Sequence, residues 1–217
     1  DDAIAHIALR VAEERLDAGH APDGRLLARA RTLVEPRSAA DAGRSRTVDA
    51  DRAAPSAHVV LAAAILLAKA GDHRGHDIVA RVVRGERIAG QAPDKEDERA
   101  AVELAGELRL EQVVPHLERR AWGVARFVRD TCPFHARIAL ARMGHDRARK
   151  EIMTELGSSR REVLSGAVVS AGRARMLEAR DLIARLTAAA VDPELTREAL
   201  ERLGSEHDVA PSSQASR

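Results

Sequence analysis

Aromatic residues and cysteine are the scarcest features of this sequence. It has no tyrosine, and its only large aromatic side chains are Trp122, Phe127 and Phe134. Cys132 is the single cysteine, which excludes an internal disulfide and suits a reducing compartment. Runs in which aromatic or β-branched residues alternate with polar ones, as in most sheets, are missing. The composition therefore argues against a sheet-based fold.

Long apolar segments are missing as well. The longest apolar run, Val59 to Ala68, is too short to span a bilayer, and the first residues lack the pattern of a signal peptide. The chain does not begin with Met, so we interpret it as a processed product, a trimmed chain or a piece of a longer protein. We expect a soluble, cytoplasmic protein that does not contact a membrane.

A recurring helix end organises the sequence. In each copy an apolar residue precedes a glycine, and a basic residue follows three positions later, as in the segment from Leu67 to Arg74. The glycine position falls at Gly71, Arg109, Gly144, Gly172 and Gly204, where Arg109 marks a copy that has lost its glycine. Such a period is typical of helix pairs that stack on one another. We predict an all-α fold, an α-solenoid of about five to six repeats.

Apolar periodicity and composition divide the chain into four parts. Residues 1–35 are predicted to form an N-terminal helix pair, either a cap or a divergent repeat, and residues 36–54 a flexible loop that mixes charges with small residues. Residues 55–210 form the repeat array and 211–217 a disordered tail. We expect helices in the array at 55–70, 94–108, 111–121, 146–156, 159–171, 175–189 and 192–203, and a second helix after Gly71.

The helix ends also carry a family resemblance. Residues 192–204, which read Asp-Pro-Glu-Leu-Thr-Arg-Glu-Ala-Leu-Glu-Arg-Leu-Gly, resemble the first helix of short bacterial HEAT repeats of the phycobilisome-lyase type. The Gly71-Asp72 pair with Arg74 is similar to the turn of that repeat, and Val114-Pro115 to its second helix. The resemblance covers residues 56–210. It implies the α-solenoid architecture and does not identify a function.

Charge is distributed unevenly along the array. Residues 86–118 include nine acidic and four basic side chains, whereas residues 119–185 include fifteen basic and seven acidic ones. If the basic residues share one concave surface, an acidic protein segment or phosphates are the expected ligands. If they alternate with Glu151, Glu155, Glu162, Glu178 and Asp181 in local pairs, they form an ordinary solvated surface. The basic residues in question are Arg126, Arg137, Arg142, Arg147, Arg149, Lys150, Arg160, Arg161, Arg173 and Arg175.

One further cluster has a functional interpretation. Trp122, Arg126 and Asp130 are spaced four residues apart, so on an unbroken helix they share a face, as in the clefts of HEAT-like DNA glycosylases. The simpler interpretation is that Trp122, Phe127 and Phe134 fill a wider gap between irregular repeats. The segment between Trp122 and Pro133 is either an extra short helix or half of a helix kinked at Pro133.

Metal binding and nucleophilic catalysis receive less support. The dipeptides His76-Asp77, His145-Asp146 and His207-Asp208 do not occupy equivalent repeat positions, so we expect no metal site and no cofactor. We interpret Cys132 as a small buried residue rather than as a nucleophile paired with His135. No catalytic residue is assigned.

The preferred function is a non-enzymatic HEAT-repeat scaffold that binds a protein partner, with an acidic segment favoured. A nucleic-acid-binding solenoid that uses the basic residues 119–185 is the second hypothesis, and an enzyme similar to a lyase or a DNA glycosylase is the third. The candidate binding residues are Trp122, Arg126, Asp130, Arg137, Arg142, Arg147, Arg160, Arg161 and Arg173.

Overall fold

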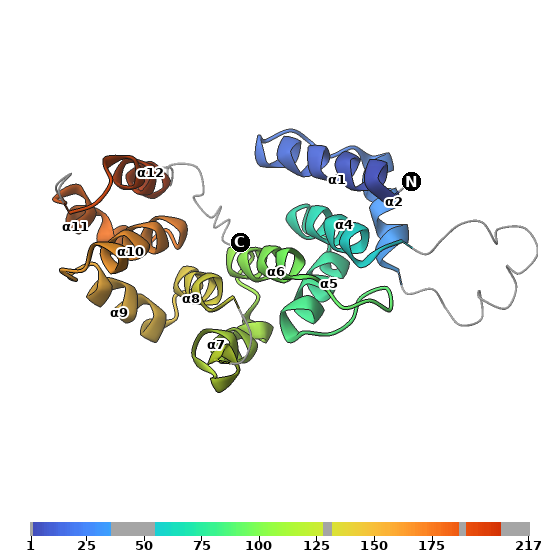
Figure 1. Ribbon diagram of the computed structural model, residues 1–217. Coiled ribbons are helices and arrows are strands. Elements are labelled where there is room, and N and C mark those ends of the chain that lie inside the picture. The colour runs from blue at the N-terminus through green and yellow to red at the C-terminus, as the bar shows by residue number, and fades with distance from the viewer. Residues whose placement is uncertain (1, 36–54, 128–131, 187–189, 205–217) are drawn as a thin grey trace, which may run out of the picture. The chain divides into compact units, whose positions relative to one another are not determined.

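The computed structural model describes residues 2–35, 55–127, 132–186 and 190–204. Within these residues the chain forms eleven α-helices and three short 3-10 helices (Figure 1). The only β-type pairing among them is an isolated bridge between Ile88 and Gln91. The prediction of an all-α fold is therefore confirmed. The finer prediction of a HEAT-type solenoid remains a proposal.

The chain divides into two compact units, Asp1–Ala136 and Arg137–Arg217. The described helices of the first unit are α1 (Asp2–Asp17), α2 (Gly24–Val34), α4 (Ala57–Lys69), α5 (His73–Arg84), α6 (Lys95–Glu107), η1 (Glu111–Val113), α7 (Val114–Trp122) and η2 (Val124–Phe127). The second unit contains α9 (Asp146–Glu155), α10 (Arg161–Arg173), η3 (Leu177–Ala179), α11 (Arg180–Ala184) and α12 (Pro193–Gly204). Helix α8 (Pro133–Arg142) crosses the boundary between the units.

Helix α4 is the centre of the first unit. Eleven of its thirteen residues are buried, because it packs against α1, α2, α5 and α6 (Figure 1). Apart from His58 and Lys69, its residues are Ala, Val, Ile and Leu, as a helix surrounded by other helices requires. Ser56 caps its first turn, because the Ser56 hydroxyl accepts a hydrogen bond from the amide of Val59. The position of α4 brings its first turn close to those of α1 and α6.

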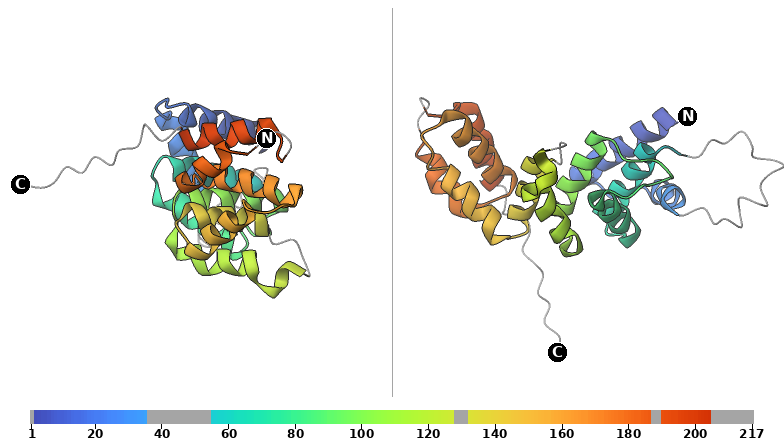
Figure 2. Two further views of the ribbon diagram at one scale, coloured as in Figure 1. Left: turned by 90° about the vertical axis from the view of Figure 1, so that its left-hand side faces the viewer. Right: turned by 60° about the horizontal axis from the view of Figure 1, so that its bottom comes forward.

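Helix α10 is the corresponding centre of the second unit. It packs against both α9 and α12, and the three helices remain neighbours in the views of Figure 2. Its buried residues include Leu164, Ala167, Val168 and Ala171. Many are small, which permits close packing of the helix axes. Pro193 stands at the start of α12, where a first helical turn tolerates proline.

Among the described residues, six helix ends share one hydrogen-bonded turn: one, at Gly85, ends α5, and the other five are the structural form of the repeat. At each end, a residue with positive φ donates its amide to the carbonyl three residues back, and the next residue donates to the carbonyl five residues before it, a Schellman motif. In the five repeat turns, the residues with positive φ are Gly19, Gly71, Arg109, Gly144 and Arg175. They close α1, α4, α6, α8 and α10, so each of these first helices is followed by a second helix in a hairpin.

The repeat position assigned to Gly172 is wrong. Gly172 lies inside α10, and the residue with positive φ is Arg175, three positions later. Gly172 serves a different purpose, because a Cβ atom there would lie 2.8 Å from Cα of Ala199 on α12. Its glycine allows two helices to approach each other. Gly204 is the last residue of α12, and the residues after it lie outside the described part of the chain.

Other predicted boundaries differ in smaller ways. In place of the helix expected at 175–189, the described residues 175–186 contain the short η3 and α11, and α11 ends at Ala184. The segment after Trp122 contains a separate 3-10 helix, as one of the two alternatives proposed. The predicted loop 36–54 and tail 211–217 lie outside the described residues.

Candidate functional site

Three first helices of the first unit place polar side chains in one cavity. His6 on α1 and His58 on α4 both stand thirteen residues before the positive-φ residue of their hairpin, and Asp97 on α6 stands twelve before its own. They therefore occupy nearly equivalent positions of successive hairpins. All three residues line a cavity of about 470 Å³. This cavity is the candidate functional site.

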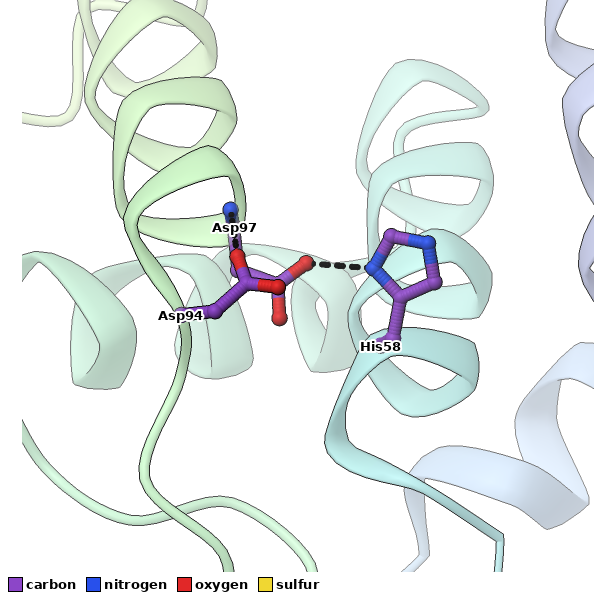
Figure 3. A group of neighbouring side chains, drawn as sticks. All are labelled: His58, Asp94 and Asp97. Atoms are coloured by element: carbon purple, nitrogen blue, oxygen red, sulfur yellow. Dashed lines mark hydrogen bonds and ion pairs between the residues drawn. The ribbon is translucent and has the colours of Figure 1, made fainter.

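A histidine and a carboxylate make direct contact in this site. Nδ1 of His58 lies 2.7 Å from Oδ1 of Asp97, and the Asp97 side chain is only 6% exposed, whereas that of His58 is 49% exposed. Asp94 caps α6, because its Oδ1 accepts a hydrogen bond from the amide of Asp97 at 2.8 Å. Donor atoms of His58, Asp94 and Asp97 all lie within 4.8 Å of one another (Figure 3). Such a set of one imidazole and two carboxylates can bind a metal ion.

His6 extends this cluster on the side of α1. Its ring stacks on that of His58, with 4.0 Å between the ring centroids and 25° between the planes. Nδ1 of His6 is buried and has no hydrogen-bond partner. Burial lowers the pKa of His6, and the nearby His58 and Arg10 lower this pKa further. The neutral imidazole is therefore favoured at this position, which leaves it a nitrogen lone pair.

The rest of the cavity combines an apolar floor with a charged rim. Leu61, Ala62, Ile65 and Ala100 line the floor. Two arginines stand at the rim, but each forms an ion pair with a glutamate on its own helix: Arg10 with Glu13, and Arg99 with Glu96. Among the described residues, neither Asp94 nor Asp97 forms an ion pair with a lysine or an arginine. Within the described part of the chain, the basic side chain in contact with Asp97 is therefore that of His58.

The structure does not bring Trp122, Arg126 and Asp130 together on one helix. Helix α7 ends at Trp122, and Gly123 has extended backbone angles, φ −68° and ψ 156°. A Cβ atom on Gly123 would lie 2.3 Å from the carbonyl oxygen of Arg119, so this sharp exit from the helix requires glycine. The shared helical face expected for a glycosylase-like cleft is therefore wrong. Arg126 lies in η2, and Asp130 lies outside the described residues.

The aromatic residues and Cys132 give a mixed outcome. Phe127 is 77% exposed, so the expectation that all three aromatic side chains fill a gap between repeats is wrong for this residue. Cys132 is buried, as expected. Nδ1 of His135 lies 2.7 Å from Oε1 of Glu103. That contact gives this ring nitrogen of His135 an acidic neighbour on α6.

Several of the predicted basic binding residues are paired with acids. Both terminal nitrogens of Arg137 donate to the carboxylate of Glu155, and Nε of Arg147 lies 3.0 Å from Oε1 of Glu151. The same holds for Arg149, which forms two hydrogen bonds with Glu178. Only the pair of Arg147 and Glu151 is a local i,i+4 pair as expected of a solvated surface, whereas the pairs of Arg137 and Arg149 join different helices. The other predicted members include Arg142 and Arg173, near the ends of α8 and α10, and the exposed Arg160 and Arg161 at the start of α10.

Sequence reasoning missed the cluster of His58, Asp94 and Asp97. The sequence prediction considered His-Asp dipeptides, whereas these three side chains come from α4 and from the start of α6. The available signal was their spacing, because His58 and Asp97 lie 39 residues apart, close to one repeat period. Comparing equivalent positions of successive repeats identifies the pair. Comparing neighbours in sequence does not.

No protein-family model, curated protein or solved structure matches the chain. Among the described helices, none combines the length and the apolar composition that crossing a bilayer requires.

Proposed function

We propose that this chain is a non-enzymatic scaffold whose helical hairpins bind a segment of a protein partner. The proposed binding surface is the cavity lined by α1, α4 and α6, and the HEAT-repeat resemblance supplies its architectural setting. The observation that carries this proposal is the combination of an apolar floor and a charged rim, to which three successive hairpins contribute. Protein interfaces have the same division into an apolar centre and a polar margin.

The rim favours a partner segment with acidic side chains beside an apolar residue. Two arginines, Arg10 and Arg99, stand around the apolar floor, together with the imidazoles of His6 and His58. Arg10 and Arg99 are about half exposed, and their present partners are glutamates of the same helix, so a partner carboxylate can replace those glutamates at little cost. An apolar side chain of the partner then covers Ala100, which lines the floor and is partly exposed.

Nucleic-acid binding is the second candidate, supported by the basic excess of residues 119–185 and the exposed Arg160 and Arg161. The ion pairs of Arg137, Arg147 and Arg149 count against it, because a phosphate must displace a carboxylate at each of them. Duplex or single-stranded DNA binding that weakens steeply with salt, and that disappears in the double variant Arg160→Glu with Arg161→Glu, would favour this candidate instead.

The protein-binding proposal is tested by blocking the cavity floor. Partners are captured from a native lysate with the immobilised chain and identified, and their affinity is then measured for Ala100→Arg. We expect Ala100→Arg to weaken binding at least about tenfold, because the added side chain occupies the floor. Ala184→Arg, the same change at an exposed position of α11, is the matched control and should bind normally. Equal binding by both variants would exclude this cavity as the interface.

A further inference from the structure

The side chains of His58, Asp94 and Asp97 form a cluster of one imidazole and two carboxylates. We propose that His58, Asp94 and Asp97 bind one divalent transition-metal ion, for which Zn²⁺ is the appropriate probe. This inference goes beyond protein binding and does not depend on it. Imidazole nitrogen suits Zn²⁺, Ni²⁺, Cu²⁺ and iron, whereas a site made of oxygen ligands alone suits Mg²⁺ or Ca²⁺. The histidine therefore shifts the expected selectivity towards transition metals.

The positions of the donor atoms suit such an ion after small side-chain rotations. Ligands of a tetrahedral Zn²⁺ site stand about 2.0–2.2 Å from the metal, which places them roughly 3.4 Å from one another. Here the donor atoms of the three residues already lie within 4.8 Å of one another. His58 and Asp97 are closer than a metal requires, at 2.7 Å, so the ion replaces their direct hydrogen bond. His58 is half exposed and has room to adjust.

The charges of the site favour a cation for the same residues. Asp97 is almost fully buried, and the carboxylate of Asp94 lies nearby without a lysine or arginine partner among the described residues. Two negative groups at this distance repel each other, most strongly where one of them is removed from water. A divalent ion neutralises both, so its binding is favoured by charge as well as by ligand type.

Binding a metal leaves the cap of α6 intact. Asp94 uses Oδ1 to accept a hydrogen bond from the amide of Asp97, and a carboxylate has a second oxygen that remains available as a ligand.

His6 is a further donor at the same cavity, because its Nδ1 is buried and has no hydrogen-bond partner. An unsatisfied buried nitrogen on the ring stacked against His58 is independent support for a ligand at this place, since coordination would satisfy it.

The test is a titration of the full chain with Zn²⁺ in competition with a chromophoric chelator. We expect a tight site with one equivalent of Zn²⁺ per chain, whose affinity falls at least about tenfold in His58→Ala, Asp97→Asn and Asp94→Asn. Asp94→Asn is the most informative variant, because asparagine caps a helix as well as aspartate but provides a weaker ligand. His73→Ala removes an exposed histidine of α5 outside the cavity and should leave the affinity unchanged.

Two controls separate this site from other metal binding. The chain has nine histidines, so Zn²⁺ binding that His58→Ala and Asp94→Asn leave unchanged would place the ion elsewhere and overturn the proposal. Equal affinity for Mg²⁺ or Ca²⁺, insensitive to His58→Ala, would also overturn it by showing an oxygen-only site. Circular dichroism establishes that each variant is folded. If His58→Ala unfolds, Asp94→Asn alone decides the outcome.

Discussion

The hairpins α4/α5 and α10/α11 close with the same turn but use glycine differently. In both turns the positive-φ residue and its successor make the same two backbone hydrogen bonds to the preceding helix. The positive-φ residue is Gly71 in the first hairpin and Arg175 in the second, with φ values of 81° and 53°. Backbone hydrogen bonds therefore hold the turn, and glycine only lowers the cost of its conformation.

Where two helices lie in close contact, by contrast, both regions depend on glycine for its lack of a side chain. Gly75, in the first turn of α5, lies against α4, and a Cβ atom there would be 2.4 Å from the carbonyl oxygen of Ala64. Gly172, near the end of α10, lies against Ala199 on α12. Packing thus requires glycine at Gly75 and Gly172, whereas the backbone conformation at Gly71 only favours it. Changing each glycine to alanine separates these two requirements.

The largest effect is expected for Gly75→Ala. The added methyl group meets backbone atoms of α4, which is enclosed by other helices and cannot move away. We expect the first unit to lose about 3 kcal/mol of unfolding free energy, the upper part of the range for overpacked cores. Urea denaturation followed by circular dichroism measures the loss.

Its control is Gly24→Ala, at the first residue of α2, where a Cβ atom would meet nothing within 4 Å. We expect Gly24→Ala to leave stability unchanged or slightly raised, because alanine reduces the freedom of the unfolded chain. A similar loss in both variants would contradict the close contact between α4 and α5.

Gly172→Ala should have a smaller effect than Gly75→Ala. Its Cβ atom would lie 2.8 Å from Cα and 2.9 Å from Cβ of Ala199. Helix α12 contacts α10 and α11 among the described helices and is less enclosed than α4, so it can shift and relieve part of the overlap. We expect a loss of about 1–2 kcal/mol for the second unit, measured in the same way. A loss equal to that of Gly75→Ala would mean that α12 is held as firmly as α4.

The same two regions show what sequence reasoning can recover. The helices were predictable, because Pro, Asp and Ser mark their starts and apolar residues recur on one face, as from Asp192 to Leu203. The prediction places the turn after α10 at Gly172, three residues too early, because it takes the glycine near the end of a first helix to be the turn residue. Gly172 has a packing role instead, and no local pattern distinguishes a packing glycine from a turn glycine.

The candidate site was harder to predict than the fold for a related reason. Trp122, Arg126 and Asp130 are correctly spaced for a helix, but a single glycine at position 123 ends that helix. His58, Asp94 and Asp97 come together only because α4 and α6 pack side by side, which is a property of tertiary structure. Their separation by about one repeat was present in the sequence, but only the packing of the hairpins makes it a contact.

Arg175→Gly is expected to stabilise the second unit, whereas most mutations at a helix end destabilise a protein. Arginine at positive φ carries a conformational cost of about 1 kcal/mol or more, and glycine removes it while adding freedom to the unfolded chain. We expect a net gain of about 0.5 kcal/mol in the unfolding free energy of the second unit, and a similar gain in the first unit for Arg109→Gly. Gly71→Ala is the converse change and should cost about 1 kcal/mol. A loss of stability in Arg175→Gly would show that its side chain contributes more than its backbone costs.

The smallest effect concerns the charges that join each turn to the preceding hairpin. Asp72, which follows Gly71, accepts a hydrogen bond from Nε of Arg31 on α2 at 2.8 Å, and Glu178, near Arg175, accepts two from Arg149 on α9. The hydrogen bond from Arg31 is the main reason that the pKa of Asp72 is lowered, and the bond from Arg149 likewise lowers the pKa of Glu178. The two regions therefore use an arginine–carboxylate contact for the same purpose.

A lowered pKa in the folded state fixes the sign of the pH dependence. Each carboxylate contributes stability above its unfolded pKa, near 3.8 for Asp72 and 4.5 for Glu178, and this contribution is lost as the pH falls through the folded value. Asp72→Asn keeps the cap of α5 but removes the charge. We expect the unfolding free energy of the wild-type chain to be higher than that of Asp72→Asn by less than about 1 kcal/mol at pH 7, because Arg31 is partly exposed. The difference should shrink below pH 4 and in high salt, and Glu178→Gln should behave in the same way. Unfolding free energies measured from pH 3 to pH 7 test this, and a difference that is independent of pH would mean that the contact acts through geometry rather than through charge.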